Sequence, residues 1–230
     1  MTTMREIDVR CAVCGALQRT VELTSTGSFG PPDLDLRPNG PARWALPFHV
    51  QRCDACGYAA RSIGSAPRQA GEVVRSVVYR DVLERSKLPG LARSYFCAAL
   101  VAEAAGEYEA SGWAFLSAAW DCDDRDLAGR ARTCRERAAE MFSRGLERGR
   151  LELSPSVALT LVAELWRRAG RFDEALASCE AADAELAEIA SAGEGEDGGS
   201  TSAVVAFLRT LATVGDDESH SCAEAFAEGD

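Results

Sequence analysis

Histidine, lysine and long apolar runs are scarce in this sequence. Among 230 residues there are two histidines and a single lysine, Lys87. Two histidines are too few for a multi-histidine metal centre combined with histidine acid–base catalysis. No apolar run approaches the roughly 20 residues that a membrane-spanning helix needs, so we expect no membrane partner.

The N-terminal segment also lacks the features of a secretion signal. It carries Arg5, Glu6, Asp8 and Arg10 and contains no apolar core, unlike a signal peptide. We therefore expect a cytoplasmic protein, whose thiols stay reduced. The nine cysteines are accordingly interpreted as metal ligands, catalytic thiols or buried small residues, and not as a disulfide set.

Motifs of the common enzyme classes are missing as well. The sequence has no phosphate-binding loop, no dinucleotide-binding glycine pattern after a strand, no Gly-x-Ser-x-Gly and no His-Glu-x-x-His. Phosphoryl, hydride and acyl transfer thus lack their signatures, and we expect a non-enzymatic protein. A pocket built across helices would not be visible at this level, so an enzyme stays an alternative.

The net charge of −11 is distributed unevenly along the chain. Residues 1–90 contain 12 basic and 9 acidic side chains, whereas residues 180–230 contain one arginine and 13 acids. Acidity disfavours nonspecific attraction to nucleic acids and anionic membranes. That argument applies to the C-terminal end and leaves the N-terminal third open to nucleic-acid binding.

The strongest chemical signal is a pair of cysteine motifs, Cys11-x-x-Cys14 and Cys53-x-x-Cys56, each followed at once by glycine. Two intervening residues let both sulfurs of a motif reach one ion, and the glycine permits a left-handed backbone turn. Four thiolates are the ligand set of a closed tetrahedral zinc site, so we predict one structural Zn²⁺. An iron–sulfur cluster and a redox Cys-x-x-Cys are the alternatives.

The remaining cysteines are scattered through predicted helices. Cys97, Cys134 and Cys179 lie on apolar faces and are predicted to be buried small residues. His49 lies four residues before Cys53, but four cysteines already complete the site. We therefore interpret His49 as a strand residue rather than as a ligand.

Composition divides the chain into a strand-prone first third and a helical remainder. We predict an α+β, mainly α fold: a zinc-ribbon domain at residues 1–68, a helical domain at 69–190, a flexible acidic linker at 191–200, and a terminal helix with a frayed acidic tail at 201–230. Short strands are expected at 6–10, 18–24, 44–52 and 58–63, and a long loop at 25–43.

Apolar spacing predicts a helix from residue 71 to a stop at Pro89, then helices at about 91–105, 108–120, 124–148, 155–170, 172–190 and 201–214. Two turns match each other, because Gly106 and Gly170 each stand between a small residue and a charged–aromatic pair. This pattern resembles the turn of a tetratricopeptide repeat and predicts a degenerate tetratricopeptide-like antiparallel helical stack. An unrelated helical bundle is the alternative.

The sequence also resembles an uncharacterised bacterial family that couples an N-terminal two-knuckle zinc ribbon to tetratricopeptide-like helices. The resemblance is carried by the two Cys-x-x-Cys-Gly motifs, by the loop SFGPPDLDLRP at residues 28–38 and by VQRCDACGY at residues 50–58. It extends over roughly residues 8–190. It implies a metal-binding, helical-repeat protein and implies no activity.

Three charged residues of that loop, Asp33, Asp35 and Arg37, alternate along the sequence. Alternating residues of an extended segment point to the same side, so they could form an acid–acid–base surface near the metal site. The other interpretation is that they pin the long loop to the ribbon through hydrogen bonds and ion pairs, since ordered loops need polar partners.

Two functions are compatible with these features. The first is a protein-interaction scaffold, because stacked helix pairs create an extended surface suited to another protein. The alternative is nucleic-acid binding by the weakly basic N-terminal domain, with Arg43, Arg52 and Arg61 as phosphate contacts and Trp44 as a stacking platform.

The predicted helix at residues 124–148 and its exit carry an excess of arginines. We expect a solvated face with ion pairs such as Glu140–Arg144 at i, i+4. Docking of the acidic C-terminal tail or of an acidic partner is the alternative.

Overall fold

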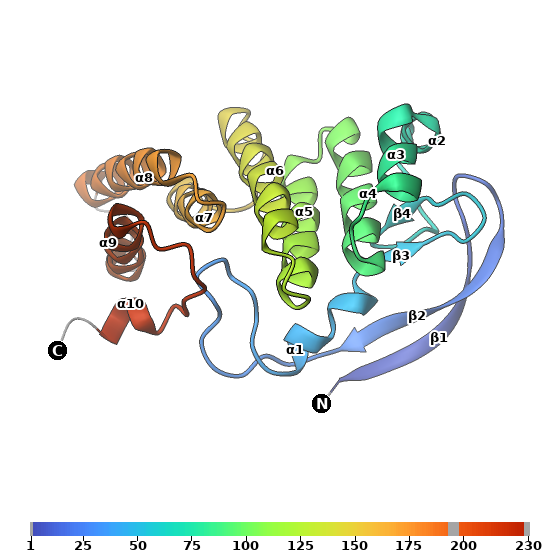
Figure 1. The fold of residues 1–230 in the computed structure, drawn as a ribbon, viewed down its shortest axis with the longest axis horizontal. Helices are drawn as coiled ribbons and strands as arrows, with labels where there is room; N and C mark the ends of the chain where they lie inside the picture. Colours follow the sequence, from blue (N-terminus) through green and yellow to red (C-terminus); the bar gives the residue numbers. More distant parts are fainter. Residues whose placement is uncertain (1, 193–197, 228–230) are drawn as a thin grey trace.

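A computed structural model describes residues 2–192 and 198–227 of the chain and confirms the predicted α+β, mainly α class. Helices make up 59% of the structure. The described residues form two separate two-stranded antiparallel sheets near the N-terminus, followed by a row of packed helices (Figure 1). No helix among the described residues is long and apolar enough to cross a membrane.

Each small sheet is a hairpin that turns at a cysteine motif. Strands β1 (Thr3–Arg10) and β2 (Leu17–Ser25) pair from Arg10↔Leu17 outward, and β3 (Gln51–Arg52) pairs with β4 (Ala59–Ala60). The first hairpin extends along the outside of the molecule as a long arm (Figure 1). The sequence therefore places both Cys-x-x-Cys motifs at hairpin turns.

Two of the predicted strands are wrong or too long. Residues 44–52 form the end of helix α1 (Pro41–Trp44), a 3-10 turn η1 (Leu46–Phe48) and only then β3. Prolines occupy the first turn of both α1 and η1, where the missing N–H costs nothing, whereas a proline cannot donate to a strand ladder. The strand expected at 58–63 is reduced to β4.

The helix expected from residue 71 is interrupted. It consists of α2 (Ala70–Arg75) and α3 (Val77–Arg85), which meet at Ser76. Ser76 adopts an extended conformation, and its hydroxyl accepts a hydrogen bond from the Tyr79 backbone N–H at 3.3 Å. The extended Ser76 ends α2, and its side chain caps the N-terminus of α3.

The rest of the chain is a sequence of helices that pack against their neighbours in chain order (Figure 1). They are α4 (Gly90–Ala105), α5 (Tyr108–Asp123), α6 (Ala128–Glu147), α7 (Pro155–Arg168), α8 (Phe172–Ala192), α9 (Gly198–Val214) and the short α10 (Glu224–Ala227). Gly106 and Gly170 have φ angles of 74° and 76°. These left-handed turns join α4 to α5 and α7 to α8, as predicted.

Three apolar clusters form the core. One joins α4, α5, α6 and α7, a second joins the cysteine motifs to α2, α3 and α4, and a third joins α7, α8 and α9. The second cluster includes residues on both sides of the predicted domain boundary at residue 68. Leu34, from the long loop, is 3% exposed and belongs to the third cluster.

The C-terminal segment differs from the frayed tail that the acidic sequence predicted. In the C-terminal segment, residues 216–222, Ser221 forms an isolated antiparallel bridge with Asp33 of the long loop. The Leu34 N–H donates to the His220 carbonyl at 2.9 Å, and the Cys222 N–H donates to the Pro32 carbonyl at 2.8 Å. The long loop and the C-terminal segment are thereby tied together. The predicted linker at 191–200 lies partly outside the described residues, and its remaining residues belong to α8 and α9.

Candidate metal centre

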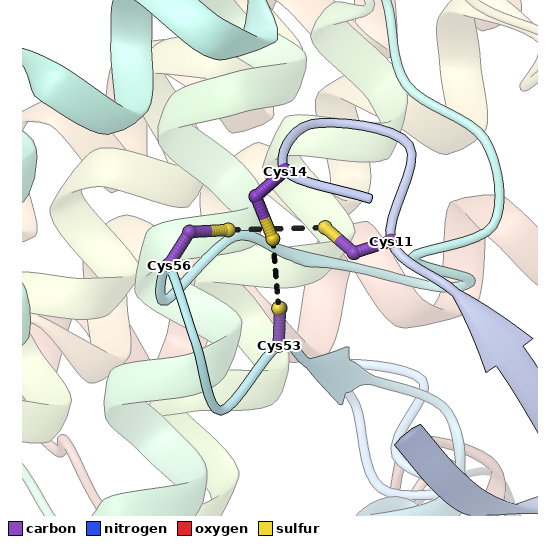
Figure 2. A group of neighbouring side chains, drawn as sticks. All are labelled: Cys11, Cys14, Cys53 and Cys56. Atoms are coloured by element: carbon purple, nitrogen blue, oxygen red, sulfur yellow. Dashed lines mark hydrogen bonds between the residues drawn. The ribbon is translucent and has the colours of Figure 1, made fainter. Parts of the chain in front are cut away.

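Four cysteine sulfurs converge where the two hairpin turns meet (Figure 2). The Sγ atoms of Cys11 and Cys56 are 3.8 Å apart and those of Cys14 and Cys53 are 3.6 Å apart. All four sulfurs lie within 4.8 Å of one another. The structure therefore unites the four cysteines singled out in the sequence, across the 38 residues that separate the motifs.

Both motifs fold into the same backbone turn. In the first, the Gly15 N–H donates to the Cys11 carbonyl at 2.8 Å, and the Cys11 N–H donates to the carbonyl of Ala16. In the second, the Gly57 N–H donates to the Cys53 carbonyl at 2.8 Å, and the Cys53 N–H donates to the carbonyl of the residue that follows Gly57, also at 2.8 Å. Both glycines have φ between 76° and 80°, a conformation open to glycine at little cost.

Helix α3 fixes the second motif in place. A Cβ atom added to Gly57 would lie 2.3 Å from the Leu83 side chain. The buried Tyr79 hydroxyl donates to the Gly57 carbonyl at 2.8 Å and accepts from the Ala59 N–H at 3.1 Å. A side chain from β2, Gln18, bonds the backbone of this turn at both Arg52 O and Asp54 N, each at 3.0 Å. The cysteine cluster is thus part of the core.

The environment distinguishes the four thiols. Cys11 and Cys53 are 1% exposed, whereas Cys56 is half-buried and Cys14 is exposed. Burial raises the pKa of the Cys56 thiol to about 12. A hydrogen bond from the Ala16 backbone N–H lowers the pKa of the Cys14 thiol. A bound cation favours the thiolate of every ligand, so metal binding would release protons here.

Two of the sulfur–sulfur separations fit a tetrahedral ion. A metal–sulfur distance of about 2.3 Å places tetrahedral ligands about 3.8 Å apart, which matches the 3.6 Å and 3.8 Å separations. Four protein ligands would leave no open position for water or substrate. Closed sites with four protein ligands are typical of structural metal ions.

The other cysteines and His49 are outside the metal cluster. Cys97, Cys134 and Cys179 are at most 1% exposed, as predicted. His49 follows η1 and is not the strand residue that we expected. Burial, together with nearby Arg61, lowers the pKa of its imidazole.

The loop residues Asp33, Asp35 and Arg37 form a charged cluster, but with partners other than the predicted ones. Asp35 binds helices α5 and α6, and Arg37 binds Asp124 just after α5. Asp33 pairs with Arg43 of α1, within residues 1–68. The chain between them is not extended, because the Leu36 N–H donates to the Asp33 carbonyl at 2.8 Å and Leu36 has φ 63°. The Asp35 carboxylate accepts hydrogen bonds from Trp120 Nε1 at 2.8 Å and from Arg135 Nη2 at 3.3 Å.

Charge pairing shapes the pKa of Asp35, whose side chain is 2% exposed. Burial acts to raise its pKa, but the positive charges of Arg135 and Arg168, with hydrogen bonds from Trp120 and the Arg37 N–H, hold it below its ordinary value of 3.8. The carboxylate is therefore kept ionised inside the protein. It pins the loop to the helices.

Around this cluster is a cavity of about 140 Å³, which we call the charged cavity. The residues lining its inner wall include Asp35, Arg37, Trp120, Asp123, Arg135 and Arg168. Sequence reasoning identified the loop residues and missed those from α5, α6 and α7. One signal was available, because Arg135 lies on the apolar face of α6 between Ala131 and Ala138, where a charged side chain must find partners.

The arginines of helix α6 and its exit are mostly exposed, as we expected, and Arg135 is the exception. Arg135 is 1% exposed. Arg144 pairs with Glu103 on α4 instead of with Glu140. Arg132 pairs with Asp217, so the C-terminal segment contacts this helix, as the alternative interpretation proposed.

The four residues predicted to contact nucleic acid in the alternative function differ in their exposure to solvent. Trp44 is 74% exposed, Arg61 is exposed and Arg52 is half-buried. The fourth, Arg43, forms an ion pair with Asp33 at 2.9 Å. Arg43 is therefore engaged within the protein.

Comparison of the chain with family models, with curated proteins and with solved structures finds no match in any of the three.

Proposed function

We propose that this chain is a non-enzymatic, zinc-binding scaffold protein, with the tetratricopeptide-like helical stack and the adjoining α1 segment as the surface for a partner protein. The observation that carries the zinc site is the convergence of four cysteine sulfurs from two matched turns. Zinc is favoured because it takes four thiolates in tetrahedral geometry, without the open position that catalysis requires.

The proposed metal is structural. The cysteine cluster shares its apolar surroundings with Tyr79, Cys97 and Val101 of helices α3 and α4. An ion at this place would lock the N-terminal hairpin onto the first helices. Because ligand thiolates must be reduced and deprotonated to bind metal, we propose the cytoplasm as the compartment.

Support for a protein partner comes from an exposed apolar surface beside the helical stack. A cavity of about 480 Å³ is lined by Thr2, Gly40, Pro41, Trp44, Ala45 and Phe48. The Trp44 side chain at its edge is 74% exposed. Exposed aromatic side chains at an apolar depression are typical anchors of protein–protein interfaces. The segment is rigidly placed, since the Tyr95 hydroxyl of α4 donates to the Leu46 carbonyl at 2.6 Å.

The partner proposal is tested by affinity capture with three forms of the full chain. Trp44→Ser should lose the partner that the wild-type protein recovers. Val78→Ser removes another exposed apolar side chain, 63% exposed on α3, and should retain it. Recovery of the same proteins by all three forms, or of none by the wild type, would contradict a partner bound at this surface.

Nucleic-acid binding by the N-terminal segment stays a second candidate because of Trp44, whose exposed ring can stack on a base. It predicts that the full chain binds single-stranded DNA or RNA with an affinity that falls steeply as salt increases. Trp44→Ser should weaken that binding by about fivefold or more, since stacking contributes about 1–3 kcal/mol per base. Absence of binding at low salt would eliminate this candidate.

A further inference from the structure

The charged cavity has a feature that the proposed metal site and partner surface leave unexplained. It lies between the long loop, the ends of α5 and α7, and the C-terminal segment, and Ser219 lines it from that segment. Four carboxylates and four arginines line the cavity, so their formal charges cancel. What differs is how far their hydrogen-bonding capacity is used.

The carboxylates of the inner wall are well supplied with donors. Asp35 accepts hydrogen bonds from Trp120, Arg135 and the Arg37 backbone N–H. Asp123 accepts from both terminal nitrogens of Arg135, at 3.1 Å and 2.5 Å. These oxygens therefore need little from a ligand.

The guanidinium groups of the same wall have donors to spare. Each guanidinium carries five N–H groups. Within the described residues, the Arg37 guanidinium hydrogen-bonds only to Asp124, and that of Arg168 only to the Asp217 carbonyl. The nearest carboxylate oxygen to Arg168, on Asp123, is 3.7 Å away, beyond hydrogen-bond distance.

Arg135 adds a buried donor with no partner. Its side chain is 2% exposed, and its Nε atom has no hydrogen-bond acceptor among the described residues. A buried polar group without a partner costs roughly 1–3 kcal/mol, and native proteins seldom keep one without a reason. Burial, together with the positive charge of Arg135, also lowers the pKa of Arg168, although nearby carboxylates act in the opposite direction.

We propose that the charged cavity binds a compact oxyanion, a carboxylate or phosphate group, held by the spare donors of Arg37, Arg135 and Arg168. Planar guanidinium groups match the two oxygens of such groups. A volume of about 140 Å³ accommodates one small group and is well below the roughly 300–1,000 Å³ of pockets for drug-sized ligands. The Ser219 hydroxyl, at the side formed by the C-terminal segment, would complete the site.

The proposal is tested by calorimetric titration of the full-length, metal-loaded protein with sodium phosphate and, separately, with sodium acetate. Sodium chloride at matched ionic strength is the control. Saturable one-to-one binding of phosphate identifies a phosphate site, and saturable binding of acetate identifies a carboxylate site. A weak ligand has a Kd of about 1 mM. If neither anion binds at concentrations up to about 10 mM, tenfold that value, the proposal is overturned.

Variants locate the binding. Arg168→Gln should weaken the anion at least tenfold, because hydrogen bonds to charged groups contribute about 1.5–3 kcal/mol. Arg144→Gln removes the same charge from an arginine outside the cavity, paired with Glu103, and should change the affinity less than twofold. Equal effects of the two substitutions would show mere charge screening and overturn the site. Ser219→Ala changes an exposed residue, so this variant should fold normally and weaken binding severalfold. It tests the site even if the Arg168→Gln variant fails to fold.

Discussion

The Asp35 carboxylate is the acceptor that holds the long loop against helices α5 and α6, and Asp35→Ala removes it. Arg135 and the Trp120 indole would then be left with unused buried donors. Removing one partner of a buried ion pair costs about 3–5 kcal/mol. For a chain of this size, such a loss lowers Tm by the order of 10 °C.

Urea denaturation of the metal-loaded protein measures this cost. The free energy of unfolding should fall by about 3–5 kcal/mol while the m-value stays the same. Asp33→Ala is the matched control, because the Asp33–Arg43 pair retains 16% and 27% side-chain exposure, against 2% for the Asp35–Arg135 pair, and removing the better hydrated pair should cost less stability. If the two variants lose similar stability, the Asp35 cluster does not pin the loop.

Three further results follow from the same contacts. Asp35 has a folded-state pKa below its ordinary 3.8, so its stabilisation is complete above pH 3.8 and is lost as the pH falls through the folded-state pKa. The difference in unfolding free energy between the wild type and Asp35→Ala, measured by urea titration, should therefore shrink below pH 3.8. A difference that stays constant would show that the carboxylate is unpaired. Gly57→Ala forces a Cβ atom to within 2.3 Å of Leu83, whereas Gly15→Ala meets no atom within 4 Å. Thermal melts should therefore show that Gly15→Ala loses about 1–2 kcal/mol of stability from backbone strain and that Gly57→Ala loses clearly more. Equal losses would contradict the packing of α3 on this turn. Truncation of residues 216–230 removes the backbone hydrogen bonds to the long loop, so limited proteolysis should cut the loop faster than in the wild type, and unchanged protection would contradict the docking of the C-terminal segment.

Local chemistry made the metal centre predictable from the sequence. A Cys-x-x-Cys-Gly motif specifies its own turn, and two copies specify a four-ligand site wherever the chain brings them together. The turns at Gly106 and Gly170 were predictable for the same local reason, because glycine readily adopts the left-handed conformation that these turns require. The misjudged strand at residues 44–52 was also local, since Pro41 and Pro47 begin helical turns, and proline at a first helical position is a recognised start signal.

The charged cavity could not be predicted in the same way, because its partners are distant along the chain. Asp35 and Arg135 are 100 residues apart, and Arg37 and Asp124 are 87 apart. Spacing within a helix shows which residues share a face but does not show what covers that face. The order of the C-terminal segment was unpredictable for the same reason. Its acidic composition indicated a frayed tail, but arginines of α6 and α7, distant in sequence, lie beside it and pair with it.

Native mass spectrometry of the purified full-length chain, after dialysis against a weak chelator, tests the central claim most directly. The wild-type protein and Cys222→Ser, which changes a half-buried cysteine outside the cluster, should each retain one zinc ion per chain. Cys53→Ser, which removes a ligand that is 1% exposed, should lose it. A wild-type protein that carries no metal, carries an iron–sulfur cluster, or keeps its zinc equally well after Cys53→Ser would contradict the proposed four-cysteine zinc centre.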